Sequence, residues 1–189
     1  MPVKPPTVPD LIYQLKITLR DSKPPIWRRV LAPGKFNLYK LHRVIQAAMG
    51  WEDGHLHQFI IDDEYYSIPL EEDFEPVLDE RRYALSRIAP EEKMKFVYEY
   101  DFGDCWEHAI VVEKILPPES GVKYPRCIVG KRACPPEDVG GVWGYEAFLE
   151  AIRDPKHEDH ERLLEWIGGE FDSEAFDLEA INRELRRVK

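Results

Sequence analysis

The fold is decided by residues 95–116, whose sequence is KFVYEYDFGDCWEHAIVVEKIL. In Lys95–Asp101 three aromatic residues occupy every second position, which places all three rings on one face of a strand. Trp106–Leu116 is long, apolar and rich in β-branched residues, as a second strand requires. Between them Phe102–Cys105 contains a glycine next to acidic residues that can bond their own backbone. The stretch therefore predicts a β-hairpin.

Further strands are predicted on the N-terminal side of this hairpin. Tyr13–Leu19 alternates apolar with polar residues, the period of a half-buried strand, and Ile26–Leu31 predicts an antiparallel partner for it. His57–Ile61 and Tyr65–Ile68 flank an acidic turn and predict a second hairpin. Glu71–Glu80 is acidic and irregular, and we expect it to be a loop.

One helix is predicted among these strands, with Asn37 as its cap, an apolar stripe from Leu38 to Met49, and Gly50 as its stop. Pro117–Gly144 holds no sustained period and predicts an ordered loop. Three apolar stripes of helical spacing follow that loop. The order predicts an α+β fold: a mixed, mainly antiparallel sheet from the first ~116 residues with one helix packed on it, followed by a helical C-terminal third.

The composition is that of an ordinary globular protein, with 189 residues, 43% hydrophobic and 33% charged. It predicts residues 1–10 as a flexible Pro-rich tail and residues 11–189 as a single domain. Three cysteines without a CxxC spacing predict free thiols in the reducing cytoplasm. Because no run of about 18 apolar residues occurs, we expect no membrane-spanning segment.

The net charge is −10, from 36 acidic and 26 basic residues. Such a surface repels phosphate backbones and anionic lipids, which makes nucleic acid an unlikely partner on charge alone. A protein or peptide is the expected partner.

Two stretches, Tyr98–His108 and Tyr124–Tyr145, concentrate aromatic, acidic, Cys, Pro and Gly residues beyond the needs of a core. The second is dense in Pro and Gly, which is typical of a rigid loop that carries function. We expect aromatic side chains there to shape a groove while Arg126 and the acidic residues orient a bound partner. The candidate groove residues are Asp101, Asp104, Trp106, His108, Tyr124, Arg126, Glu137, Asp138, Trp143 and Tyr145.

The alternative is a hydrolase that uses the segments Asp101–His108 and Cys134–Asp138 with a divalent metal or a thiol. Carboxylates and His108 would hold the metal, or Cys105 would act as the nucleophile. Structural turns and core imidazoles account for the same residues more simply. The decisive question is whether the two segments meet in one cleft. Further candidate metal ligands, on weaker spacing, are His55, His57, His108, Cys127 and Cys134.

Several blocks, in order along the chain, resemble one family. They are Tyr13–Arg29, Leu41–Trp51, His55–Phe59, Tyr100–His108, Tyr124–Cys127 and Cys134–Gly141, with Gly144 and Tyr145 after it. Together they resemble the plasmid pRiA4b ORF-3-like family, some of whose members are described as passenger proteins of transposable elements. The resemblance implies a single α+β domain found in prokaryotes and an association with mobile elements, and it implies no reaction.

The function expected from all these observations is a non-catalytic binding or adaptor module associated with mobile elements. The alternatives are the metal- or thiol-dependent hydrolase and a nucleic-acid-binding accessory protein. Only the association with mobile elements suggests the last of these, and it conflicts with the net charge.

Overall fold

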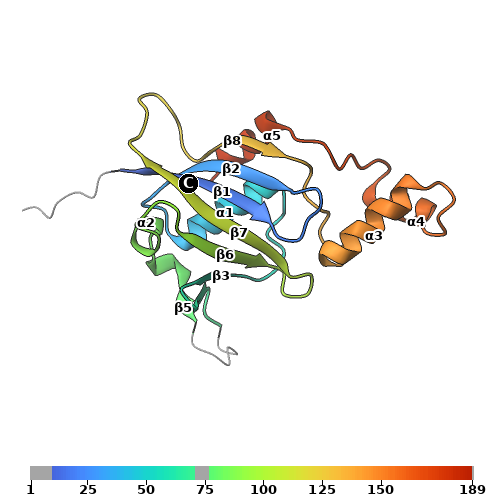
Figure 1. The fold of residues 1–189 in the computed structure, drawn as a ribbon, viewed down its shortest axis with the longest axis horizontal. Helices are drawn as coiled ribbons and strands as arrows, with labels where there is room; N and C mark the ends of the chain where they lie inside the picture. The colour runs from blue at the N-terminus through green and yellow to red at the C-terminus, as the bar shows by residue number, and fades with distance from the viewer. Residues whose placement is uncertain (1–9, 71–76, 189) are drawn as a thin grey trace, which may run out of the picture.

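The computed structural model describes residues 10–70 and 77–188, which form one eight-stranded sheet and five α-helices (Figure 1). The strand order is β5-β4-β3-β6-β7-β1-β2-β8, and every neighbouring pair is antiparallel except β4 with β5. The predicted flexible tail, apart from residue 10, lies outside the described residues. The strands are β1 Ile12–Leu19, β2 Trp27–Pro33, β3 His57–Ile61, β4 Glu64–Ser67, β5 Leu78–Asp79, β6 Lys95–Tyr100, β7 Trp106–Leu116 and β8 Arg126–Lys131. The helices are α1 Leu38–Met49, α2 Leu85–Ile88, α3 Gly141–Arg153, α4 His160–Ile167 and α5 Leu178–Leu185, with a 3-10 turn at Glu80–Arg82.

The sheet buries one face and exposes the other, as the alternation in its strands predicts. In β1 the side chains of Leu15 and Ile17 are fully buried, and α1 lies behind this face in the view of Figure 1. The opposite face carries polar pairs between strands, such as the ion pair across β1 in which Arg29 Nε of β2 lies 2.6 Å from Glu113 Oε2 of β7. The α+β class and the mainly antiparallel sheet are therefore confirmed.

Helix α1 has the boundaries that its sequence predicts. The Asn37 side chain accepts a hydrogen bond from the Lys40 backbone N–H, and Gly50 ends the helix in the left-handed conformation at φ 104°. Its buried stripe joins the core beneath the sheet.

The C-terminal helices take two different positions. Helix α5 contacts both α1 and the edge strand β8. Helices α3 and α4 pack on each other and stand beyond one end of the sheet (Figure 1). No helix in the described part of the chain is long and apolar enough to cross a membrane.

Two expectations from the sequence were wrong. Pro117–Gly144 is not simply a loop, because Arg126–Lys131 forms β8 and pairs antiparallel with β2, so the sheet extends beyond the first ~116 residues. The register shifts opposite Arg29 and Val30, where β8 contains the extra residue Ile128, and the proline before the strand hid its short apolar run. Within the predicted loop 71–80, residues 71–76 lie outside the described part, but Leu78–Asp79 forms β5 and Glu80 begins the 3-10 turn.

Candidate functional site

The two dense stretches of the sequence meet where the β6–β7 turn contacts the loop that leads into α3 (Figure 1). The Gly140 backbone N–H donates to Asp104 Oδ2 at 3.1 Å, and the Tyr100 hydroxyl donates to Glu137 Oε1 at 2.7 Å. Gly141, at φ 68°, passes so close to this turn that a β-carbon would lie 2.5 Å from the Asp104 carbonyl oxygen. Two hydrogen bonds therefore join the two stretches, and Gly141 permits the close backbone approach between them.

A third segment, the chain that follows α1, closes the same junction. The Glu52 backbone N–H donates to Glu137 Oε1 at 3.2 Å, the oxygen that also accepts from Tyr100. The Trp51 indole N–H donates to the Pro135 carbonyl at 3.1 Å. Burial and then the hydrogen bond to Glu137 raise the pKa of the Tyr100 hydroxyl, so this phenol stays protonated and remains a donor.

One imidazole lies between two carboxylates at the surface of the junction. His55 Nδ1 is 3.6 Å from Asp101 Oδ2, and His55 Nε2 is 3.2 Å from Asp138 Oδ1. The Asp101 side chain is 12% exposed, whereas that of Asp138 is 71% exposed. Asp101 is held in place because its Oδ1 accepts from the backbone N–H groups of Gly103 and Asp104. We call Asp101, Asp104, Glu137 and Asp138, together with His55, the acidic junction.

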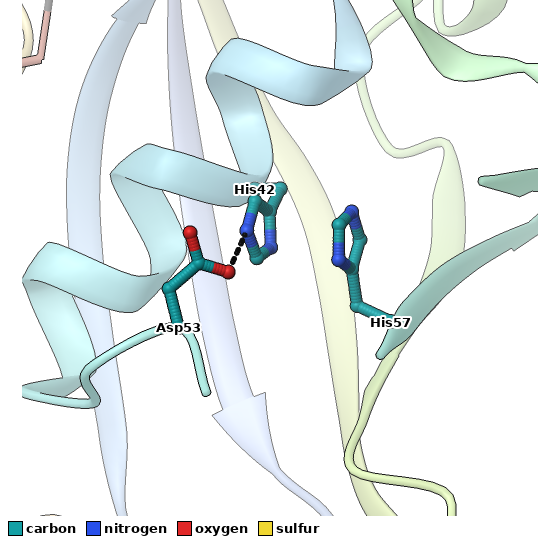
Figure 2. A group of neighbouring side chains, drawn as sticks. All are labelled: His42, Asp53 and His57. Atoms are coloured by element: carbon teal, nitrogen blue, oxygen red, sulfur yellow. Dashed lines mark hydrogen bonds and ion pairs between the residues drawn. The ribbon is translucent and has the colours of Figure 1, made fainter. Parts of the chain in front are cut away.

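A second group of potential metal ligands, His42, Asp53 and His57, lies beneath the sheet (Figure 2). The two imidazole rings are stacked, with centroids 3.5 Å apart and planes 4° from parallel. A metal binds an imidazole in the ring plane, along a nitrogen lone pair. The lone pairs of two stacked rings lie in two separate parallel planes, so no single point lies in both planes. Both His42 nitrogens are also occupied, and His57 Nε2 lies 3.0 Å from both Glu80 oxygens. This group fits a hydrogen-bonded core and not a metal centre.

A closed ring of hydrogen bonds fixes the protonation of His42. The Asp53 backbone N–H donates to Gln46 Oε1 at 3.0 Å, and Gln46 Nε2 donates to the Tyr98 hydroxyl at 2.9 Å. The hydroxyl proton is then free to point at His42 Nδ1, 2.8 Å away, so His42 Nε2 carries the proton that faces Asp53 Oδ1 at 2.7 Å. Burial, followed by the neighbouring His57, lowers the pKa of His42 to about 2, and the ring is neutral.

Several predicted site residues belong to the core instead. Trp106 and His108 are fully buried on the inner face of β7, and Tyr145 is 6% exposed. Trp106 Nε1 and His108 Nε2 have no hydrogen-bond partner among the described residues. His57 is likewise buried, stacked on His42. These side chains cannot line an open groove.

The remaining predicted residues are divided between two surfaces. Trp143 lies in the first turn of α3 next to the acidic junction and is 81% exposed. Tyr124 and Arg126 lie instead at the start of β8, where Arg126 lines a separate pocket. The structure thus brings together Asp101, Asp104, Glu137 and Asp138, and it leaves Tyr124 and Arg126 elsewhere.

None of the three thiols has the surroundings of a nucleophile. Cys105 is exposed, and desolvation together with neighbouring carboxylates, Glu99 first, raises its pKa. Burial raises the pKa of Cys127 and of Cys134. Because the thiolate is the reactive form, these positions favour the unreactive thiol. His108, Cys127 and Cys134 also do not form a metal-ligand group in the described part of the chain.

The sequence did not reveal a groove between α3 and α4, which has a volume of about 410 Å³. Asp138 lines it, so the groove is continuous with the acidic junction. Trp166, 47% exposed, also lines it. The apolar stripe of α4, a helix with no buried residue, was the available signal. The apolar lining residues are Val139, Ala147, Phe148, Ala151, Leu163 and Trp166.

Three comparisons agree with this fold. Residues 11–180 match the sequence model of the family described as plasmid pRiA4b ORF-3-like protein. A Sinorhizobium fredii protein named "Uncharacterized protein y4hQ" is 42% identical over 174 residues, which cover 91% of this chain and 89% of that protein. The crystal structure of the protein of unknown function MM3350 from Methanosarcina mazei Go1 superposes with a TM-score of 0.82 at 39% identity, covering 92% of this chain and 97% of the other. The chain therefore belongs to the plasmid pRiA4b ORF-3-like family.

Proposed function

We propose that the protein is a non-catalytic binding module that recognises a positively charged segment of a protein partner at the acidic junction. The observation that carries the proposal is the meeting of carboxylates from two distant stretches, Asp101 with Asp104 and Glu137 with Asp138, beside the α3–α4 groove.

Charge complementarity favours a cationic ligand at this face. The junction gathers four carboxylates, two of which, Asp101 and Asp138, face His55, and the whole chain carries a net charge of −10. Asp138 is the carboxylate most open to solvent, at 71% of its side chain. A Lys or Arg side chain of a partner would gain attraction here, and the summed field would accelerate its approach.

Exposed apolar side chains border the same junction. Leu56 follows His55 and is 55% exposed, Phe102 follows Asp101 and is 46% exposed, and Trp143 is 81% exposed. The Asp101 backbone N–H donates to the Leu56 carbonyl at 2.8 Å, which places these segments side by side. Large aromatic side chains are the common anchors of protein interfaces, and an indole ring also attracts cations.

The α3–α4 groove can bind an apolar side chain of the same partner. Its volume of about 410 Å³ lies within the range of sites that bury small ligands or single side chains. Asp138 belongs both to the groove and to the contact with His55. A segment with one apolar residue between basic residues would therefore match the surface.

Selection from a displayed random peptide library tests this function. We expect the selected peptides to be enriched in Lys or Arg around a large apolar residue. Their affinity should fall at least about tenfold, equal to about 1.4 kcal/mol, in Asp138→Asn and in Trp143→Ala. Glu91→Gln is the matched control, because it removes another exposed carboxylate that lies outside the junction. Selected peptides without a basic bias, or equal binding by all three variants, would refute the proposal.

A metal-dependent hydrolase is the second candidate, because single ligand atoms of His55, Asp101 and Asp138 lie within 4.8 Å of one another. Imidazole with carboxylates suits Zn²⁺ or Mn²⁺. The two His55 nitrogens face different carboxylates, however, so one acidic side chain would have to rotate toward the metal. Adding Zn²⁺ or Mn²⁺ to tag-free protein should raise the Tm of the wild type and not of His55→Ala. The absence of any shift would remove this candidate.

A further inference from the structure

A basic pocket lies beside the edge strand β8, between the loop that precedes it and the C-terminal end of α5. Its volume is about 370 Å³. Lys123, Arg126 and Arg186 line it, and no acidic residue does so among the described residues. The other lining residues are Gly121, Val122, Pro125 and Asn182. It shares no lining residue with the α3–α4 groove, so it is a separate site.

The two arginines of this pocket lack the partners that other arginines have. Within the described residues, an arginine normally has an ion pair, an aromatic ring or a hydrogen-bond acceptor, as Arg29 has with Glu113 and Arg87 has with Tyr83. The exceptions are Arg126, Arg183 and Arg186, and two of the three line the pocket. The chain has 36 acidic residues against 26 basic ones, so a shortage of carboxylates does not explain why these arginines lack ion-pair partners.

Helix electrostatics explains only part of this cluster. Arg186 is the C-cap of α5, where a cation interacts favourably with the helix dipole. Lys123 and Arg126 come from another segment, so their presence in the pocket is not a matter of capping that helix. Three like charges around one hollow repel one another. A bound anion would convert that repulsion into attraction.

The pocket is also held in a fixed shape. The Cys127 backbone N–H donates to Asn182 Oδ1 at 2.9 Å, and Asn182 Nδ2 donates back to the Cys127 carbonyl at 3.0 Å. This pair of hydrogen bonds joins α5 to the residue that follows Arg126 in β8. Arg126 and Arg186 therefore line the pocket from two elements that these hydrogen bonds tie together, which lowers the ordering cost of binding.

We propose that this pocket binds the phosphate groups of a small ligand that carries two or more negative charges. Guanidinium groups present paired N–H donors that match phosphate oxygens, and a lysine ammonium adds a third positive charge. Three cations balance a phosphate ester or a pyrophosphate group. A volume of about 370 Å³ accommodates such a group with part of the molecule that carries it. The inference is independent of the peptide-binding function.

Isothermal titration calorimetry with inorganic pyrophosphate tests the site. We expect saturable one-site binding by the wild type, weakened at least tenfold in Arg126→Gln and in Arg186→Gln. Arg183→Gln is the matched control, because Arg183 belongs to the same helix and has no partner among the described residues, yet does not line the pocket. It should bind like the wild type. Arg186 is exposed at a helix end, so its variant stays folded even if Arg126→Gln does not.

Further probes separate the sources of the phosphate. ADP binding tighter than pyrophosphate identifies a nucleotide-like ligand, and equal affinities identify the phosphate group alone; either result supports the site. Absence of saturable pyrophosphate binding overturns the proposal, as does an equal loss in Arg183→Gln. Preference for a duplex DNA oligonucleotide over both small probes also overturns it, because that would mark a nucleic-acid surface.

Discussion

Acid should destabilise this protein through a buried histidine, and His108→Phe should remove part of that effect. His108 is fully buried on β7, and its Nδ1–H faces the Tyr98 carbonyl at 3.3 Å. Its Nε2 has no partner among the described residues. Burial lowers the pKa of His108 from 6.5 to about 4, so the folded protein holds this ring neutral.

The magnitude follows from proton linkage. In the unfolded chain His108 takes up a proton near its usual pKa of 6.5, whereas in the folded protein it does so only near pH 4. Stability is therefore full above pH 6.5 and falls by about 1.4 kcal/mol for each pH unit between pH 6.5 and pH 4. At pH 5 the loss from His108 is about 2 kcal/mol. His42, whose pKa is lowered to about 2, adds a similar loss, and together they remove a large share of the ~5–15 kcal/mol typical of a domain.

Urea unfolding followed by tryptophan fluorescence measures this, at pH values from about 7.5 down to about 5. The phenylalanine variant also loses the bond to the Tyr98 carbonyl, so its absolute stability differs and the slope against pH is the informative quantity. Below pH 6.5 we expect the free energy of unfolding of the variant to depend less steeply on pH than that of the wild type, by about 1.4 kcal/mol per pH unit, because one fewer proton is taken up on unfolding. Parallel slopes in the two proteins would refute the neutral, buried state of His108.

Two more predictions concern buried groups. Tyr98→Phe removes the hydroxyl that faces His42 and accepts from Gln46, and it should cost about 2–5 kcal/mol in urea unfolding because two buried polar groups lose their partner. Tyr66→Phe, whose hydroxyl has no hydrogen bond among the described residues, should cost less than about 1 kcal/mol. In thiol labelling under native conditions, Cys105 should react first and the two less accessible cysteines only on unfolding. Equal labelling rates for all three thiols would contradict their burial.

The elements with a clear period were predictable from sequence alone. The alternation in β1 and the capped stripe of α1 are local signals, and the structure places both as expected. Strand β8 was missed because it is a short run that follows a proline, and its pairing with β2 is interrupted by an extra residue, Ile128, in β8 itself. The two-residue β5 carries no signal of its own, since its parallel pairing with β4 is purely tertiary.

The site was predictable in composition but not in arrangement. The stretches that hold Asp101 and Asp138 could be recognised by their unusual residues, yet the sequence could not place His55 between them, because that contact joins three distant segments. Aromatic residues were the main source of error. Trp106 and Trp143 are both tryptophans in the dense stretches, and the sequence does not distinguish them. Strand alternation buries Trp106, whereas the position of Trp143 in the first turn of a helix exposes it.

The amide of Asn182 has a consequence for how copies of the protein meet. An edge strand such as β8 offers unpaired N–H and C=O groups to any strand from another molecule, which is the usual first step of sheet-to-sheet aggregation. Asn182 supplies one acceptor and one donor to Cys127, as a peptide unit of an added strand would. Phe176 covers Gly130 further along, where a β-carbon would lie 2.6 Å from its ring. The Asn182 side chain thus occupies backbone groups of β8 that a strand from another molecule would otherwise pair with, and this protects the edge of the sheet against aggregation.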